Sequence, residues 1–139
     1  MLQFLLDTDH LTLLERSHPP LLQRMGQQPP DVIGVSAVTA EEALRGRLGY
    51  LARPLSGVGL VRAYALLIGT IQLLNQMPTV PFDEPAETTW QQLRAQRLRV
   101  GTQDLKIAAI ALVNSLIVLT RNRRDFGQIP GISLDDWSV

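Results

Sequence analysis

The sequence predicts an α/β fold in a single domain that covers residues 1–139, and three observations lead to this prediction. A length of 139 residues suits one domain. Hydrophobic residues make up 45% of the chain and charged residues 19%, which provides for a packed core. Short apolar runs alternate along the chain with longer stretches of helical spacing. Because strands that alternate with helices form parallel sheets, we expect a short parallel β-sheet with helices on both faces.

The predicted strands are short apolar runs, most of them rich in β-branched residues. The run Leu116–Leu119 is the clearest buried strand. Pro81 cannot donate a backbone hydrogen bond, so the strand that contains it is expected at an edge of the sheet or at a strand end. The predicted strands are Gln3–Leu6, Val32–Ser36, Thr79–Phe82, Leu116–Leu119 and Ile132–Leu134.

Helices are predicted between these strands from capping residues and apolar spacing. Any residue of Asp7–Asp9 can cap the first helix. Thr39 and Glu42 have the spacing of a capping box, which predicts that a helix begins at Thr39. The segment after Leu119 is predicted to be a loop that leads to the last strand. The predicted helices extend to Glu15 and then over Pro20–Gln28, Thr39–Leu51, Leu60–Met77, Pro85–Arg99 and Asp104–Asn114.

Composition and motifs exclude several classes of protein. The chain has no cysteine, and its two histidines, His10 and His18, lie close in sequence without a third partner, which argues against a zinc site. The apolar stretch Ile107–Leu119 is about 13 residues long, shorter than the roughly 20 that span a bilayer, so no membrane span is expected. The N-terminus lacks the basic segment of a secretory signal, which favours the cytoplasm. No phosphate-binding glycine motif occurs, so no nucleotide cofactor is expected.

The net charge of zero conceals a basic segment. Residues 90–124 contain seven of the thirteen lysines and arginines and a single acid, Asp104. Such a segment can attract a polyanion. The same side chains also suit solvated helix and loop positions, so charge alone leaves both interpretations open.

Acidic and amide side chains gather near the ends of the predicted strands. Asp7 follows the first strand, Glu42 lies in the helix after the second, and Asp104 begins the helix before the Leu116–Leu119 strand, which Asn122 and Asp125 follow. Each alone fits a helix cap or a turn. Together they are expected to converge on the sheet edge where ligands of parallel sheets bind. Clustered carboxylates repel one another and favour Mg²⁺ or Mn²⁺, which take oxygen ligands.

These motifs resemble the PIN-domain ribonucleases, specifically the VapC-like toxins of toxin–antitoxin pairs. The resemblance covers nearly the whole chain and implies the PIN-like three-layer sandwich. It rests on four blocks with compatible spacing, which are LLDTDHLT, VSAVTAEEALRG, VGTQDLKIAAIAL and VLTRNRRDFGQIPGI.

The resemblance implies that Asp7, Glu42 and Asp104 bind the metal. The chain departs from the family pattern at the fourth acid, because Asn122 stands where many members have Asp. Asp125 is the candidate replacement, so the fourth catalytic residue is either Asn122 or Asp125.

The implied activity is Mg²⁺-dependent hydrolysis of RNA phosphodiester bonds, with Mn²⁺ as the other candidate ion. Thr8, Thr120 and Asn122 are expected to support the carboxylates or to orient the attacking water. Contacts to the RNA backbone are expected from Arg121, Arg123 and Arg124.

The resemblance also implies two protein partners, a cognate antitoxin and a second copy of the chain in a homodimer. The apolar helix predicted over Leu60–Met77 is the candidate for part of the antitoxin groove or for the dimer face. An ordinary core helix would have the same composition.

Three competing hypotheses remain at this point. The first is a PIN-like nuclease with another role, in RNA processing or on DNA. The second is an inactive PIN-like domain that binds RNA or a protein and has lost catalysis through Asn122. The third is a phosphatase similar to the haloacid dehalogenases, because Asp7-Thr8-Asp9 follows a first strand, although Lys106 beside Asp104 fits the order of that family poorly.

Overall fold

The computed structural model describes all 139 residues and contains one parallel sheet of five strands. The strand order is β3-β2-β1-β4-β5, so β1 lies at the centre and β3 at an edge, as Pro81 predicted. The strands are β1 (Phe4–Leu6), β2 (Ile33–Ser36), β3 (Thr79–Val80), β4 (Ile117–Leu119) and β5 (Ser133–Asp135).

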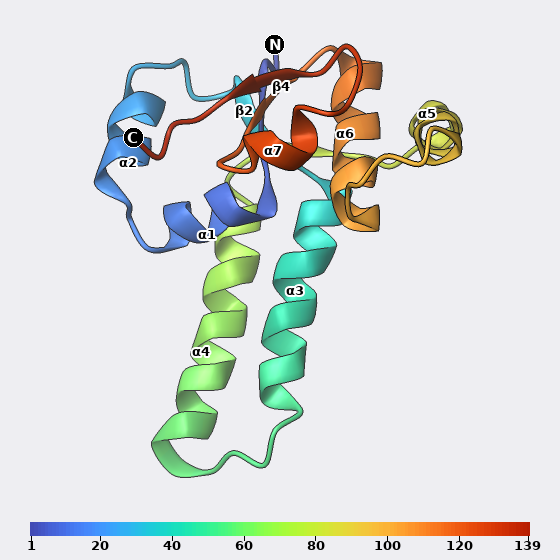
Figure 1. Ribbon diagram of the computed structural model, residues 1–139. Coiled ribbons are helices and arrows are strands. Elements are labelled where there is room, and N and C mark those ends of the chain that lie inside the picture. Colours follow the sequence, from blue (N-terminus) through green and yellow to red (C-terminus); the bar gives the residue numbers. More distant parts are fainter.

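Seven helices connect the strands, and helices lie on both faces of the sheet (Figure 1). On one face, Leu5 and Val118 pack with buried residues of α5 and α6. On the other face, Phe4 and Leu6 pack with α1 and α2. The predicted three-layer α/β fold is therefore confirmed. The helices are α1 (Thr8–Glu15), α2 (Pro19–Gly26), α3 (Ala37–Leu51), α4 (Gly57–Leu74), α5 (Glu84–Ala95), α6 (Thr102–Asn114) and α7 (Arg123–Phe126).

The two longest helices, α3 and α4, form a hairpin that extends away from the sheet (Figure 1). Only 11% of the residues of α4 are buried, although this helix is long and apolar enough to cross a membrane by length and composition alone. It is a longer apolar element than Ile107–Leu119, the stretch on which the sequence-based prediction relied. The apolar surface of α4 is therefore largely uncovered by the chain itself.

Several predicted boundaries are wrong for local physical reasons. Helix α3 begins after Ser36, whose Oγ accepts the backbone N–H of Thr39 at 3.0 Å, so Thr39 does not cap it. Helix α5 ends at Ala95, before the left-handed backbone of Arg97 (φ 52°). The short helix α7 lies in the segment predicted to be a loop and begins after Asn122.

The strand register places the start of the candidate site. Leu6 pairs with Val35 of β2 and with Leu119 of β4, so the carboxyl ends of the three central strands lie side by side, with β2 one residue longer than the other two at this end. The next residues, Asp7, Ser36 and Thr120, consequently share one edge of the sheet, and all three are buried.

Candidate metal centre

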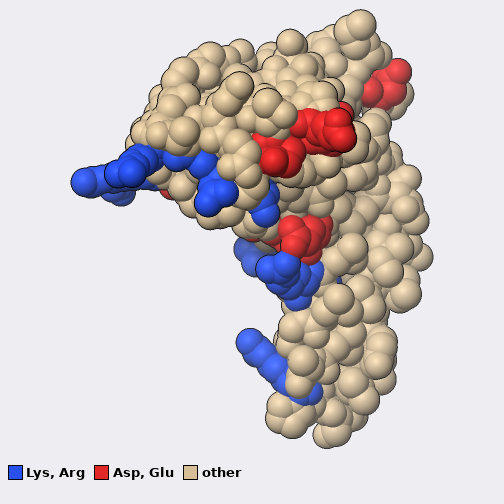
Figure 2. All heavy atoms as spheres, turned by 90° about the vertical axis from the view of Figure 1, so that its right-hand side faces the viewer, with Lys and Arg blue, Asp and Glu red and all other residues tan.

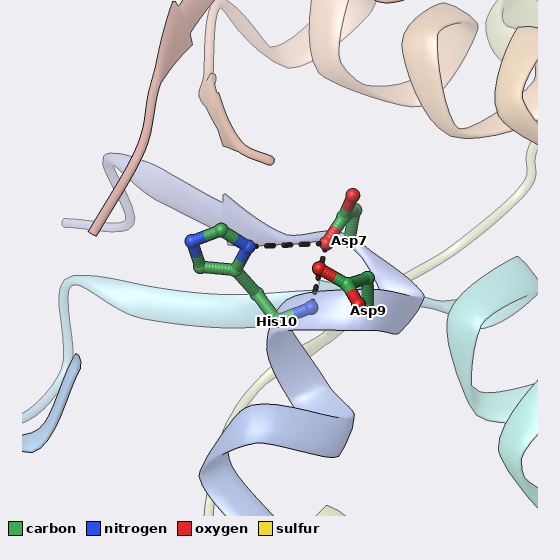
Figure 3. A group of neighbouring side chains, drawn as sticks. All are labelled: Asp7, Asp9 and His10. Atoms are coloured by element: carbon green, nitrogen blue, oxygen red, sulfur yellow. Dashed lines mark hydrogen bonds and ion pairs between the residues drawn. The ribbon is translucent and has the colours of Figure 1, made fainter. Parts of the chain in front are cut away.

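Asp7 is held in place by the start of α1. Its side chain is 5% exposed and caps the helix, with Oδ1 accepting the backbone N–H of His10 at 2.7 Å. The His10 ring nitrogen Nδ1 lies 3.4 Å from the same oxygen. Figure 3 shows the second oxygen of Asp7 pointing away from His10. Asp7 can therefore offer one oxygen as a ligand while the other keeps the carboxylate oriented.

The His10 ring lies beside Asp7 inside the protein. The ring is fully buried, and its Nε2 accepts the backbone N–H of Trp137 at 3.2 Å. In the neutral ring this bond leaves the proton on Nδ1, the nitrogen that faces Asp7. From the sequence, His10 was considered as a zinc ligand and was given no place beside Asp7. The signal that indicates its place is the spacing of three residues from Asp7, which brings the two side chains together at the first turn of a helix.

Glu42 enters the site from the second turn of α3. The Thr8 hydroxyl donates to its Oε1 at 2.6 Å and lies 3.3 Å from the hydroxyl of Thr39. The neighbouring Glu41 turns away and pairs with Arg45 and with Gln103. The structure thus brings Glu42, rather than Glu41, towards Asp7, and Thr8 orients its carboxylate.

Asp104 lies in the first turn of α6 and shows that the acids converge. Burial raises the pKa of Asp104 to about 6, and repulsion from the carboxylates of Asp7, Glu42 and Asp125 adds to the rise. All four predicted acids are therefore close enough to interact. Their negative charge is incompletely compensated by the chain, which is the situation that a bound divalent cation relieves.

Asn122 connects Asp104 and Asp125 through its side-chain amide. Its side chain caps α7, with Oδ1 accepting the backbone N–H of Asp125 at 3.3 Å. Its Nδ2 donates to Asp125 Oδ2 at 3.1 Å and lies 3.5 Å from Asp104 Oδ2. The Thr120 hydroxyl accepts the backbone N–H of Asn122 at 2.9 Å and so shapes the turn. The Asn122 amide therefore contacts the carboxylates of both Asp104 and Asp125.

The three arginines around α7 differ in whether they pair with a carboxylate. Arg121 forms two hydrogen bonds of 2.7 Å to Asp9, which lower the pKa of that carboxyl. Arg123 lies 3.9 Å from Asp135. Arg124 is exposed and forms no ion pair. Of the three arginines predicted to contact RNA, Arg124 alone has no carboxylate partner.

The chemistry of the donor set fits a hard divalent cation. The tightest group of potential ligand atoms belongs to Asp7, Asp9 and His10, which lie within 4.8 Å of one another (Figure 3). However, Asp9 is engaged by Arg121 and the Nε2 of His10 by Trp137. The remaining donors, including the free oxygen of Asp7, are carboxylates, the ligands that Mg²⁺ and Mn²⁺ take in proteins.

Comparisons with known proteins identify the family and the fold. The family model described as "PIN domain" matches residues 5–132. The chain is 28% identical to the "tRNA(fMet)-specific endonuclease VapC" of Salmonella typhimurium over 99% of both chains. A solved structure of DNA-bound VapBC from the same organism has a TM-score of 0.78, with 27% identity and 99% coverage of each chain. VapBC-5 of Mycobacterium tuberculosis, from a family of toxin-antitoxin systems, has a TM-score of 0.60, with 27% identity and 98% coverage of each chain.

Proposed function

The chain belongs to the PIN domain family, and on this premise we propose that it is a divalent-metal-dependent endoribonuclease that acts as the toxin of a toxin–antitoxin pair. The observation that carries the proposal is the convergence of four carboxylates, in which Asp7, Glu42 and Asp125 surround Asp104 and help burial to raise its pKa to about 6. The similar proteins named above as a tRNA endonuclease and as parts of toxin-antitoxin systems support the choice of substrate and biological role.

In this proposal Asp7, Glu42 and Asp104 hold the cation, which is Mg²⁺, with Mn²⁺ as the alternative. A bound divalent cation polarises the phosphate and lowers the pKa of a water ligand. The side chains of the site supply the fixed positions: His10 and the start of α1 orient Asp7, and Thr8 orients Glu42. These supporting bonds keep the ligands in place before the substrate arrives.

Asn122 and Asp125 have complementary parts in the proposal. The Asn122 amide donates to Asp125 and faces Asp104, so it fixes both carboxylates. Asp125 is left to orient the attacking water and to accept its proton. Arg124, which forms no ion pair, is the arginine of this region best placed to contact an RNA phosphate.

The proposed protein partners suit the exposed face of α4. The large apolar side chains exposed on this helix are Val58, Leu60, Val61, Tyr64, Ile68 and Ile71. An apolar surface of this kind is typical of a protein interface. We assign it to the cognate antitoxin or to a second copy of the chain in a homodimer in the cytoplasm.

A cleavage assay tests the nuclease. Purified protein, free of antitoxin, is incubated with tRNA in Mg²⁺, in Mn²⁺ and in EDTA. We expect cleavage only with metal and a loss of at least about 100-fold in Asp7→Asn and Asp104→Asn, because each removes a direct ligand. The exposed Asp31→Asn is the matched control and should cleave as the wild type does.

The competing hypothesis is an inactive PIN-like domain, and its basis is Asn122 at a position where an acid is common. It predicts no cleavage by the wild type under any metal condition and no heat of Mn²⁺ binding in calorimetry. Cleavage that persists in EDTA or in Asp7→Asn would contradict the metal-dependent mechanism.

A further inference from the structure

A groove leads from the metal centre onto the α3–α4 hairpin. Its first part is a cavity of about 480 Å³ that begins at Thr8 and Glu42. Its second part is a cavity of about 560 Å³ farther along the hairpin. The two cavities share four lining residues, which are Gly46, Arg47, Arg62 and Leu66. They therefore form one continuous surface, which we call the hairpin groove.

The charge of the hairpin groove changes sign along its length. Glu42 lies at the end nearest the metal centre, whereas the far part is lined by Arg45, Arg47, Arg53 and Arg62. Figure 2 shows basic side chains on the underside of the sheet domain and on the hairpin, around a hollow between the two. An anionic chain that enters at the metal centre can thus continue onto a positively charged surface.

Two of these arginines have their charge uncompensated. Arg47 pairs with Glu15 and donates to the Thr70 hydroxyl, and Arg45 pairs with Glu41. Arg53 and Arg62 are exposed and form no ion pair. Guanidinium groups that are free of carboxylates are well suited to phosphate, which they can bind through two parallel hydrogen bonds.

Two glycines of α3 leave the groove open. Gly46 and Gly49 are exposed, and a Cβ added at either would meet no atom within 4 Å. Packing therefore does not require glycine at these positions, although glycine weakens a helix interior relative to alanine. Their location allows a ligand to approach the helix backbone closely.

Tyr50 adds an aromatic surface to the same part of the groove. Its ring is half-buried, and the Arg53 guanidinium lies 5.6 Å from the ring centroid. Along the helix, Tyr50 lies about 12 Å from Glu42, at a rise of about 1.5 Å per residue. Tyrosine rings and arginine planes are the surfaces on which single-stranded RNA bases stack.

We infer that the hairpin groove binds the single-stranded RNA that flanks the scissile phosphate, with Arg53 and Arg62 on backbone phosphates and Tyr50 beneath a base. This inference rests on the proposed function. RNA accounts for the continuity with the metal centre, where a phosphate must lie, and for the aromatic ring beside the free arginines. An acidic peptide would use the arginines alone.

Binding of a fluorescein-labelled single-stranded RNA, measured by anisotropy in EDTA over a range of salt concentrations, tests the inference. We expect Arg53→Ala and Arg62→Ala each to weaken binding about 5-fold and to make the slope of log K against log[salt] shallower by about 0.7, the value for one phosphate contact on a single strand. Tyr50→Leu should weaken binding without changing the slope. The control Arg94→Ala removes an equal charge from α5, where the guanidinium lies on Trp90, and should change neither quantity.

Steady-state cleavage with Mg²⁺ provides a second measurement. The arginine variants should raise KM and leave kcat within about 2-fold of the wild type, because neither side chain reaches the reacting atoms. A series of RNAs extended on one side of the cleavage site should bind the wild type progressively more tightly. The double variant Arg53→Ala/Arg62→Ala should lose this gain.

The outcomes separate this inference from the proposed function. If the wild type cleaves RNA and the arginine variants bind and cleave as the wild type does, the groove assignment is wrong and the nuclease stands. If the variants instead lose affinity only for a poly-glutamate peptide, the groove accepts an acidic protein segment and the inference is also wrong. A wild type that neither binds nor cleaves RNA overturns the proposed function itself.

Discussion

The sheet edge and the α3–α4 hairpin differ in how their side chains are supported by the rest of the chain. At the sheet edge, each acid has an identified support: α1 and His10 hold Asp7, Thr8 holds Glu42, and Asn122 holds Asp125. On the hairpin, large apolar side chains are exposed, and two arginines, Arg53 and Arg62, have no carboxylate partner. One region is fixed in geometry but unbalanced in charge, and the other is regular in backbone but uncovered on its surface.

This difference indicates which kind of ligand each region suits. A cluster of positioned carboxylates calls for a small cation, which needs exact geometry and little area. An exposed apolar and basic hairpin calls for macromolecules, which need area more than exact placement. The hairpin groove joins the two regions, so in the proposed function it would lead a substrate from the hairpin to the cation.

The largest expected difference is in the free energy of unfolding, when isoleucine is replaced by alanine in α6, which carries part of the sheet edge, and in α4 of the hairpin. Ile110→Ala removes a fully buried side chain from α6, the helix that carries Asp104, and should lower the free energy of unfolding by about 2–5 kcal/mol. Ile68→Ala removes a side chain that is 52% exposed on α4 and should change it by less than about 0.5 kcal/mol. Urea unfolding followed by circular dichroism measures both. Equal losses would show that the hairpin belongs to the cooperative core.

Most of the fold was predictable because its signals are local. Short apolar runs indicated the strands, and Pro81 indicated the edge strand correctly. The start of α3 was predicted at Thr39 because Thr39 and Glu42 have the spacing of a capping box. Ser36 can also cap a helix, and only the structure shows that its hydroxyl accepts the backbone N–H of Thr39. Helix α7 is four residues long, too short to show any periodicity.

The site was predictable to the extent that its residues follow strands. Asp7, Glu42, Asp104 and Asp125 were expected together, and in the structure the other three carboxylates lie near enough to Asp104 to help burial raise its pKa. The support of His10 by Trp137 was missed because these residues are 127 positions apart, and only the tertiary fold joins them. The pairing of Arg121 with Asp9 was missed for the same reason, since it spans 112 positions. The roles of the four acids in catalysis stay predictions.

The next prediction uses the unbalanced charge of the sheet edge. Because burial and repulsion raise the pKa of Asp104 to about 6, this carboxyl is protonated below that pH and must lose its proton to bind a cation. Apparent Mn²⁺ affinity, measured by calorimetry, should fall about tenfold per pH unit below pH 6 and level off above pH 7. An affinity that stays constant from pH 5 to 7.5 would mean that Asp104 is not a ligand.

The smallest expected effect separates stability from function at the same residue. In the metal-free protein, the pKa of Asp104 lies above its ordinary value of 3.8, so the unfolded chain loses this proton first as the pH rises. Stability is therefore lost between about pH 4 and pH 6, and Asp104→Asn should recover about 1 kcal/mol at pH 7.5 but almost nothing at pH 3.5. Thermal unfolding in EDTA measures this gain as a rise in Tm of about 4 °C. Asp31→Asn, which removes an exposed carboxylate, should not raise Tm. A destabilised Asp104→Asn protein would show that this carboxylate stabilises the fold. A stabilised variant that binds no metal would show that Asp104 lowers the stability of the metal-free protein and is needed to bind the cation.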